Sequence, residues 1–133
     1  MKDDTGIQIP QQLIAWQTAH TFVLAVFEAC EALYEYNTLR QQMEKAAISV
    51  MSNIAEGFGR QTIPDKKHFY VIARGSIYEL LNQIIIAHDR HIFSKESCSR
   101  LTELSTTALK TTTQSNPRLN KIKPQVNTML PNY

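Results

Sequence analysis

The sequence predicts an all-α protein, an antiparallel four-helix bundle whose chain runs up, down, up and down. Apolar residues recur every three or four positions in four segments, polar caps, glycines and prolines separate these segments, and no β-alternation is long enough for a sheet. The length of 133 residues suits one domain with one core. We expect helices at about 11–36, 38–58, 63–92 and 95–115, forming one domain at 1–115, and an irregular C-terminal tail at 116–133.

The first two helices follow from their stripes and caps. The first helix carries an apolar stripe with one histidine in it: Leu13, Trp16, His20, Val23, Phe27, Cys30 and Tyr34. Asn37 and Thr38 can cap the second helix. We expect that helix to end at Gly57 to Gly59, because glycine readily adopts the left-handed conformation that closes a helix.

The third helix carries more than one apolar stripe. Thr62 can cap it, and Pro64 and Asp65 suit its first turn. Apolar residues cover most of its circumference, with Tyr78 and Ile85 on an additional stripe, whereas a helix in a four-helix monomer has one outward face. The excess apolar surface predicts a subunit interface.

The fourth helix has the weakest pattern. Ser94 can cap it, but the stretch from Thr106 to Thr113 has poor helix propensity. Pro117, Pro124 and Pro131 disrupt any helix beyond residue 116, which predicts the irregular tail. Four apolar residues of the tail can dock onto another surface: Leu119, Ile122, Val126 and Met129.

Composition narrows the classes of function. Residues 1–59 hold three Lys and Arg against seven Asp and Glu, and residues 60–133 hold eleven against five. The basic second part permits an acidic or nucleic-acid partner. Cys30 and Cys98 form no CxxC pair, so we expect buried thiols and neither a disulfide nor a zinc ribbon. No stretch approaches the roughly 20 apolar residues of a membrane span, and MKDDTG leads into no signal segment, so we expect a cytoplasmic protein without membrane contact.

Polar residues on the second and third helices form one candidate site. They are Asn53, Glu56, Ser76, Glu79 and Gln83. Carboxylates at this spacing could bind metal, but di-iron bundles use Glu-x-x-His pairs, and no Glu here has His three residues later. The interpretation we favour is a hydrogen-bond network that fixes helix register or a subunit interface.

Histidines offer a second candidate. His88 and His91 are one helical turn apart with Asp89 between them, but structural zinc needs four ligands and catalytic zinc usually three. We expect solvated histidines, and for His20 a core or interface position. No nucleophile with a recognisable base accompanies them. The sequence therefore predicts no metal, no cofactor, no small-molecule substrate and no enzymatic activity.

Charged stripes leave two interpretations open. Glu28, Glu31 and Glu35 form either a solvated face or a face that meets basic residues of a neighbouring subunit. The basic residues Arg60, Lys66, Lys67 and Arg74 lie around the turn between the second and third helices, where they are either ordinary surface cations or phosphate contacts. Three nearby aromatic residues could stack on bases or pack in the core: Phe58, Phe69 and Tyr70.

One run of residues resembles a known family. The segment from Ala46 to Arg60, AAISVMSNIAEGFGR, is similar to the signature of the bacterial four-helix bundle proteins named for 23S rRNA intervening sequences. Ala15-Trp16-Gln17 resembles that family's opening, and Ile72 to Ser76 with Glu79 and Gln83 resembles its third helix. The resemblance runs from about Leu13 to about Leu104. This chain has Met51 where the family usually has proline, and Glu44-Lys45 where it often has paired basic residues.

The resemblance implies a left-handed bundle that assembles into a ring-like homopentamer without known enzymatic activity. A related branch comprises accessory proteins of diversity-generating retroelements, which bind nucleic acid and a reverse transcriptase. We therefore expect a scaffold that binds RNA or DNA, with a reverse transcriptase as a further partner; the alternative is a purely protein-binding module. Candidate nucleic-acid contacts are Arg40, Lys45, Arg60, Lys66, Lys67 and Arg74. Candidate structural and interface residues are Trp16, Asn53, Glu56, Gly57, Ser76, Tyr78, Glu79, Gln83 and Ile85.

Overall fold

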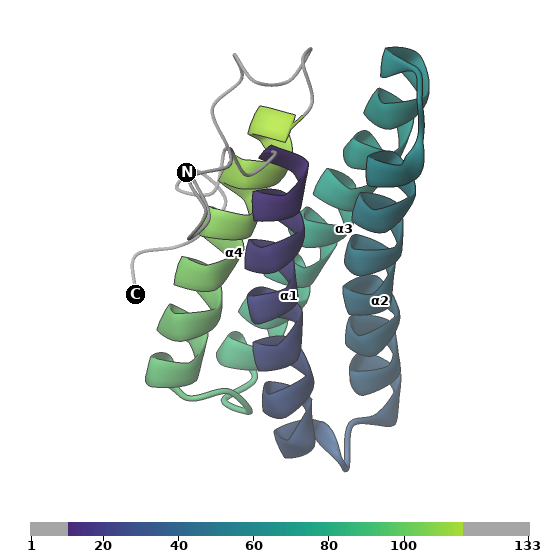
Figure 1. The fold of residues 1–133 in the computed structure, drawn as a ribbon. Helices are drawn as coiled ribbons and strands as arrows, with labels where there is room; N and C mark the ends of the chain where they lie inside the picture. The colour runs from purple at the N-terminus through teal and green to yellow at the C-terminus, as the bar shows by residue number, and fades with distance from the viewer. Residues whose placement is uncertain (1–10, 116–133) are drawn as a thin grey trace.

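The structure is a computed structural model that describes residues 11–115, with side chains from Leu13 onward. Its four α-helices are α1 (Gln11–Ala29), α2 (Asn37–Gly59), α3 (Ile63–Asp89) and α4 (Lys95–Ser115), and a short 3-10 helix, η1 (Cys30–Leu33), continues α1 (Figure 1). No strand occurs in the described part of the chain, which confirms the prediction of an all-α protein with four helices. The predicted tail at 116–133 lies outside the described residues.

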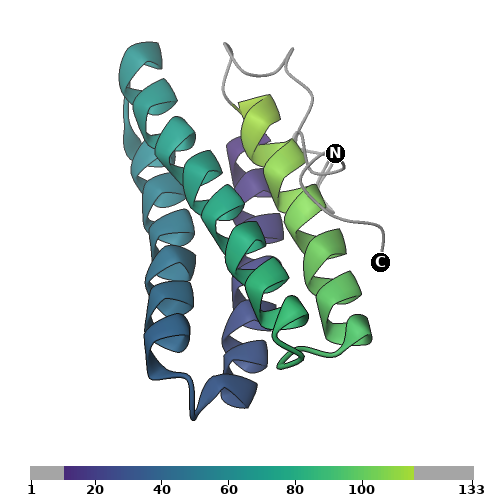
Figure 2. The same ribbon diagram turned by 180° about the vertical axis from the view of Figure 1, so that it is seen from behind.

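The four helices lie side by side and run alternately in opposite directions (Figures 1 and 2). α2 packs most closely on α3 and α1 on α4, and looser contacts of α1 with α2 and of α3 with α4 complete the ring of helices. The α2–α3 turn and the C-terminal end of α4 lie at one end of the bundle, which we call the α2–α3 end. The opposite end, with η1 and the α3–α4 loop, is the η1 end.

Large apolar side chains from all four helices fill the space between them. Burying one side chain of this size stabilises a fold by about 1.5–3 kcal/mol. The large aliphatic and aromatic residues with no exposed surface or nearly none include Phe22, Leu33, Met43, Ile54, Ile77, Leu80, Leu81, Ile84, Leu101 and Leu109.

The first helix ends earlier than the sequence predicts. The apolar stripe predicts a helix to about residue 36, but the α-helix stops at Ala29 and tightens into η1. Such 3-10 turns are frequent where an α-helix ends. The Tyr36 backbone N–H donates to the Leu33 carbonyl at 2.8 Å, which closes the turn into α2. The tighter winding leaves Cys30 and Leu33 buried in the core.

The starts of α3 and α4 follow the predicted caps. The Asp65 backbone N–H donates to Thr62 Oγ1 at 3.3 Å, and Pro64 lies in the first turn of α3. The Ser97 backbone N–H donates to Ser94 Oγ at 3.1 Å. Both hydroxyls satisfy an N–H group that has no partner within its own helix.

The helix ends do not use left-handed glycine. The prediction that glycine closes α2 in that conformation is wrong, because Arg60 follows with an extended backbone at φ −78° and ψ 150°. The left-handed residue is His91, with φ 60°, after α3. The Ile92 N–H donates to the Ala87 carbonyl at 2.9 Å and the His91 N–H to the His88 carbonyl at 2.9 Å, which is the Schellman arrangement.

The threonine-rich helix α4 remains regular to Ser115. Its hydroxyls donate to carbonyls one turn earlier, for example Thr106 to Thr102 at 2.9 Å and Ser115 to Thr111 at 2.9 Å. Thr111 also hydrogen-bonds to Thr18 of α1 at 2.6 Å. These bonds satisfy the hydroxyls that form them without disrupting the helix. The hydroxyls of Thr102, Thr112 and Thr113 are buried without a hydrogen-bond partner among the described residues.

One segment, Leu13–Leu33, is long and apolar enough to meet the length and composition of a membrane span, although the sequence pattern predicts no such stretch. The same properties are found in core helices of globular bundles. Ala19, Phe22 and Val26 in this segment have no exposed surface, because they face the other helices. The core accounts for the apolar character of α1, so the segment is weak evidence for a membrane span.

Candidate functional surface of α2 and α3

A short polar network joins the middle of α2 to α3. Ser49 Oγ and Ser76 Oγ lie 2.8 Å apart, and Asn53 Nδ2 donates to the Ser49 carbonyl at 2.8 Å and to Ser49 Oγ at 3.1 Å. The sequence did not single out Ser49, although it lies one helical turn before Asn53. The three side chains hydrogen-bond at a partly buried contact between helices, which fixes their register.

The other predicted network members lie apart from these three. Gln83 Nε2 donates to Glu79 Oε1 at 3.5 Å, within α3. Gln83 is only 7% exposed, and its Oε1 has no hydrogen-bond partner among the described residues. Glu56 is exposed and forms an ion pair with Arg60 at 3.0 Å. The predicted site is therefore two hydrogen-bonded groups and a separate surface ion pair.

Apolar side chains lie on the outer surface of α2 and α3. Ile72 is 39% exposed and Ile86 is 43% exposed. Gly75 lies between them in the sequence, and a Cβ added to it would have nothing within 4 Å. On α2, Ile48 is 56% exposed. Toward the η1 end, a groove of about 740 Å³ has Gln83 and Ile86 in its lining.

Tyr78 and Ile85, which the sequence places on the predicted interface stripe, are only partly exposed in the single chain. Both are half-buried, and Tyr78 packs against the core. The Arg74 guanidinium lies over the Tyr78 ring, 5.2 Å from its centre. Ile72 and Ile86 are better candidates for the excess apolar surface of α3.

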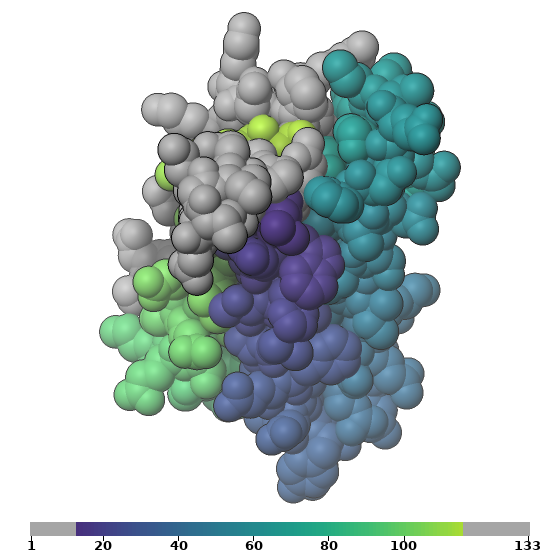
Figure 3. Space-filling view, in the orientation of Figure 1, coloured from purple at the N-terminus to yellow at the C-terminus, as the bar shows by residue number. Residues whose placement is uncertain are grey.

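Arg60, Lys66 and Lys67 lie together at the α2–α3 end, which projects at the upper right of Figure 3. Lys66 Nζ donates to the carbonyls of Gly57 and Phe58 at 3.2 and 3.1 Å, and so caps the C-terminal end of α2. Besides its pair with Glu56, Arg60 lies 4.7 Å from the Phe69 ring centre. Arg60 and Lys66 thus also stabilise the turn.

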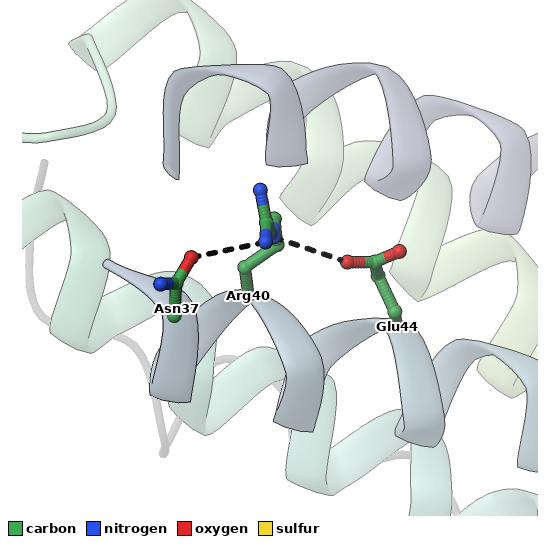
Figure 4. A network of polar contacts seen from close by, with 3 residues as sticks. All are labelled: Asn37, Arg40 and Glu44. Atoms are coloured by element: carbon green, nitrogen blue, oxygen red, sulfur yellow. Dashed lines mark hydrogen bonds and ion pairs between the residues drawn. The ribbon is translucent and has the colours of Figure 1, made fainter. Parts of the chain in front are cut away.

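The remaining basic candidates do not join this cluster. Arg40 bonds Asn37 at 3.0 Å and Glu44 at 3.5 Å, near the start of α2 (Figure 4). At about 1.5 Å of rise per residue, Arg40 lies roughly 30 Å along the helix from Arg60. Lys45 is exposed a little further along α2 than Arg40. The six predicted residues therefore do not form one continuous patch.

Aromatic residues near the basic turn have different environments. Phe58 is 49% exposed, Phe69 is half-buried, and Tyr70 has no exposed surface. The Tyr70 ring lies against buried Gly57 of α2, where an added Cβ would lie 2.6 Å from Tyr70 Cε1. On α1, the Trp16 and His20 rings stack with centres 4.8 Å apart. Of the three aromatics near the turn, Phe58 has the most surface for a contact with a partner.

Among the described residues, Cys30 and Tyr70 have strongly raised pKa values, and both lie in the core. Burial raises the pKa of Tyr70 from 10.0 to about 12. Burial, and then the Glu44 carboxylate, raise the pKa of the Cys30 thiol from 9.0 to about 11, against a smaller opposing effect of Arg40. Both groups are neutral at pH 7, so neither is activated as a nucleophile or base.

The histidine candidates remain scattered. His88 Nδ1 lies 3.3 Å from Asp89 Oδ1, and His91 is exposed at the left-handed turn. Within residues 11–115, no group of three or more His, Cys, Asp or Glu side chains is arranged to hold a metal ion. The surface of α2 and α3 thus offers hydrogen bonds, apolar contacts and cations, which are the means of binding a macromolecule.

Comparison with known proteins bears on the predicted resemblance. No curated protein matches the sequence. The model of one family, described as 23S rRNA-intervening sequence protein, matches residues 11–114, which include all four helices. This match confirms the family predicted from the segment between Ala46 and Arg60. The chain belongs to the family of 23S rRNA-intervening sequence proteins.

Proposed function

We propose that this chain is a non-enzymatic, homo-oligomeric scaffold that binds nucleic acid. Its left-handed bundles assemble into the ring-like homopentamer that the family resemblance implies, and the assembly works in the cytoplasm. A reverse transcriptase is a candidate protein partner, as in retroelement accessory proteins. The observation that carries the proposal is the outer surface of α2 and α3, where exposed apolar residues lie beside a nearly buried amide oxygen without a partner among the described residues.

The oligomeric part of the proposal follows from this surface. Ile72 and Ile86 expose apolar area, and contact with a second copy would remove it from water at a gain of about 25 cal/mol per Å². Gln83 Oε1, which lacks a partner among the described residues, would accept a hydrogen bond from the neighbour after a small side-chain rotation. Open space at Gly75 allows the neighbouring backbone to approach closely.

Replacing Ile86 with glutamate should dissociate the assembly. The wild-type mass by light scattering should be five times the 15.2 kDa chain mass, and that of Ile86→Glu close to one chain. Helicity by circular dichroism should not change, since the side chain is 43% exposed. Ile63→Glu is the matched control, because Ile63 is 56% exposed but lies in the first turn of α3. A monomeric wild type, or an Ile86→Glu variant of unchanged mass, would exclude this interface.

The nucleic-acid part of the proposal follows from the α2–α3 end. Lys67 and Arg60 lie at the same end of the bundle as exposed Phe58, which could stack on a base. Lysine and arginine contacts to phosphates give affinity without sequence preference, and repetition around a ring multiplies a modest patch. Lys66 contributes charge while it caps α2.

Lys67→Gln should weaken binding of labelled RNA or DNA regardless of sequence. Removing one phosphate contact per subunit should reduce the slope of log affinity against log salt by about one per contact. Fluorescence anisotropy between low and moderate salt measures both quantities. Lys95→Gln is the control, because Lys95 is exposed at the η1 end. If the wild type binds no RNA or DNA at low salt, the nucleic-acid role is wrong and the protein-binding module replaces it.

A further inference from the structure

A second groove lies at the η1 end, between the end of α1, η1, the α3–α4 loop and the start of α4. Its volume is about 770 Å³. Its apolar lining includes Ala29, Phe93 and Leu101, of which the last two are buried. Glu28 and Glu31 lie on the α1 side, and Arg100 lies on the α4 side.

The α1 side of this groove is acidic. Glu28 and Glu31 are exposed, and neither forms an ion pair with another described residue, Arg100 included. Residues 11–35 contain no Lys or Arg, so nothing on this stretch of chain neutralises the two carboxylates. An occupant with both apolar and basic side chains would match the groove.

We propose that the occupant is the chain's own C-terminal segment, residues 116–133. This segment contains three basic residues, Arg118, Lys121 and Lys123, and no Asp or Glu. After the last basic residue it carries Val126, Met129 and Leu130. Of the three basic residues, Lys121 and Lys123 meet Glu28 and Glu31, and the apolar residues that come after them enter the groove.

The lengths of the elements permit this path within one chain. Ser115 ends α4 at the α2–α3 end, and the groove residues Ser97 and Leu101 lie about 21–27 Å back along that helix at 1.5 Å per residue. An extended chain covers about 3.3 Å per residue, so Lys123 reaches roughly 26 Å from Ser115, and Val126 and Met129 roughly 36–46 Å. Attachment to α4 also gives this segment a high effective concentration, which favours it over a second copy.

Photo-crosslinking of the full-length chain tests the proposal. A benzophenone amino acid placed at Val126 should crosslink, after irradiation, to peptides that contain residues 25–32 or 92–101, as read by mass spectrometry. When equal amounts of ¹⁵N-labelled and unlabelled chains are unfolded and refolded together, so that each assembly contains both, these crosslinks should join peptides of one isotope only. Crosslinks between isotopes would assign the groove to a second copy and overturn the proposal.

Reversing the charge of one groove residue distinguishes specific docking of the C-terminal segment from crosslinking by random collision. Glu31→Lys should lower the yield of the groove crosslinks at least fivefold, because the basic residues then meet a positive charge. Glu56→Lys makes the same change in charge at the opposite end of the bundle and should leave the yield unchanged. Crosslinks elsewhere on the bundle, or an equal yield in the two variants, would refute docking in this groove.

Discussion

Replacing Gly57 with alanine should destabilise the bundle by about 2–3 kcal/mol. The added methyl group would lie 2.6 Å from Tyr70 Cε1 and 3.0 Å from Cδ1, well inside van der Waals contact. The Tyr70 ring has no exposed surface and is enclosed by the core, so it cannot move aside without disturbing its neighbours. The higher helix propensity of alanine, about 1 kcal/mol, offsets only part of this cost. Urea denaturation followed by circular dichroism measures the change.

Two other glycines provide matched controls for this substitution. A Cβ on Gly59 or on Gly75 would have nothing within 4 Å. In the dissociated Ile86→Glu background, where no neighbouring subunit approaches Gly75, Gly75→Ala in the interior of α3 should stabilise the chain by up to about 1 kcal/mol, and Gly59→Ala at the end of α2 should have a smaller effect. If all three variants gained stability, the close packing of α2 on Tyr70 would be refuted.

The four helices and the caps of α3 and α4 are predictable from sequence because the signals are local. The prediction that Asn37 or Thr38 caps α2 is wrong, because Tyr36 precedes that helix and no side chain caps it. Thr62 and Ser94 cap N–H groups three residues later, and the apolar repeat of each helix needs no knowledge of its neighbours. The family was also recognisable, because the segment from Ala46 to Arg60 that resembles its signature is continuous in the sequence. These features require only interactions between residues close in the chain.

The packing contacts were not predictable because they join residues distant in sequence. The conformational freedom of glycine predicts a helix end at Gly57. Its observed role is to make room for the Tyr70 ring of the next helix. In the sequence, Ser49 is one of several small residues on α2, and only the structure shows that its Oγ lies 2.8 Å from Ser76 Oγ of α3. Lys66 resembles any surface cation until α3 brings it to the carbonyls that end α2. Sequence periodicity identifies a face of a helix but not the residue that it meets.

Alkaline pH should destabilise the bundle through two buried acids, Cys30 and Tyr70. Their folded-state pKa values, about 11 and about 12, lie above the ordinary values of 9.0 and 10.0. The unfolded chain therefore loses these protons at lower pH than the folded chain. The stability they contribute is complete below pH 9 and is lost progressively as pH rises toward 12. Each shift corresponds to at most about 3 kcal/mol when ionisation is complete.

Single substitutions assign the two parts of this pH dependence. Cys30→Ala should reduce the loss of stability that begins near pH 9, and Tyr70→Phe should reduce the loss that begins near pH 10. Urea denaturation at a series of pH values measures both changes. Lysine titration overlaps this range, but it is common to all three proteins and cancels in the differences. Tyr70→Phe should cost little at pH 7, because the Tyr70 hydroxyl has no partner among the described residues. If wild type and both variants lost stability in parallel above pH 9, the thiol and the phenol would have to be accessible to water in the folded state.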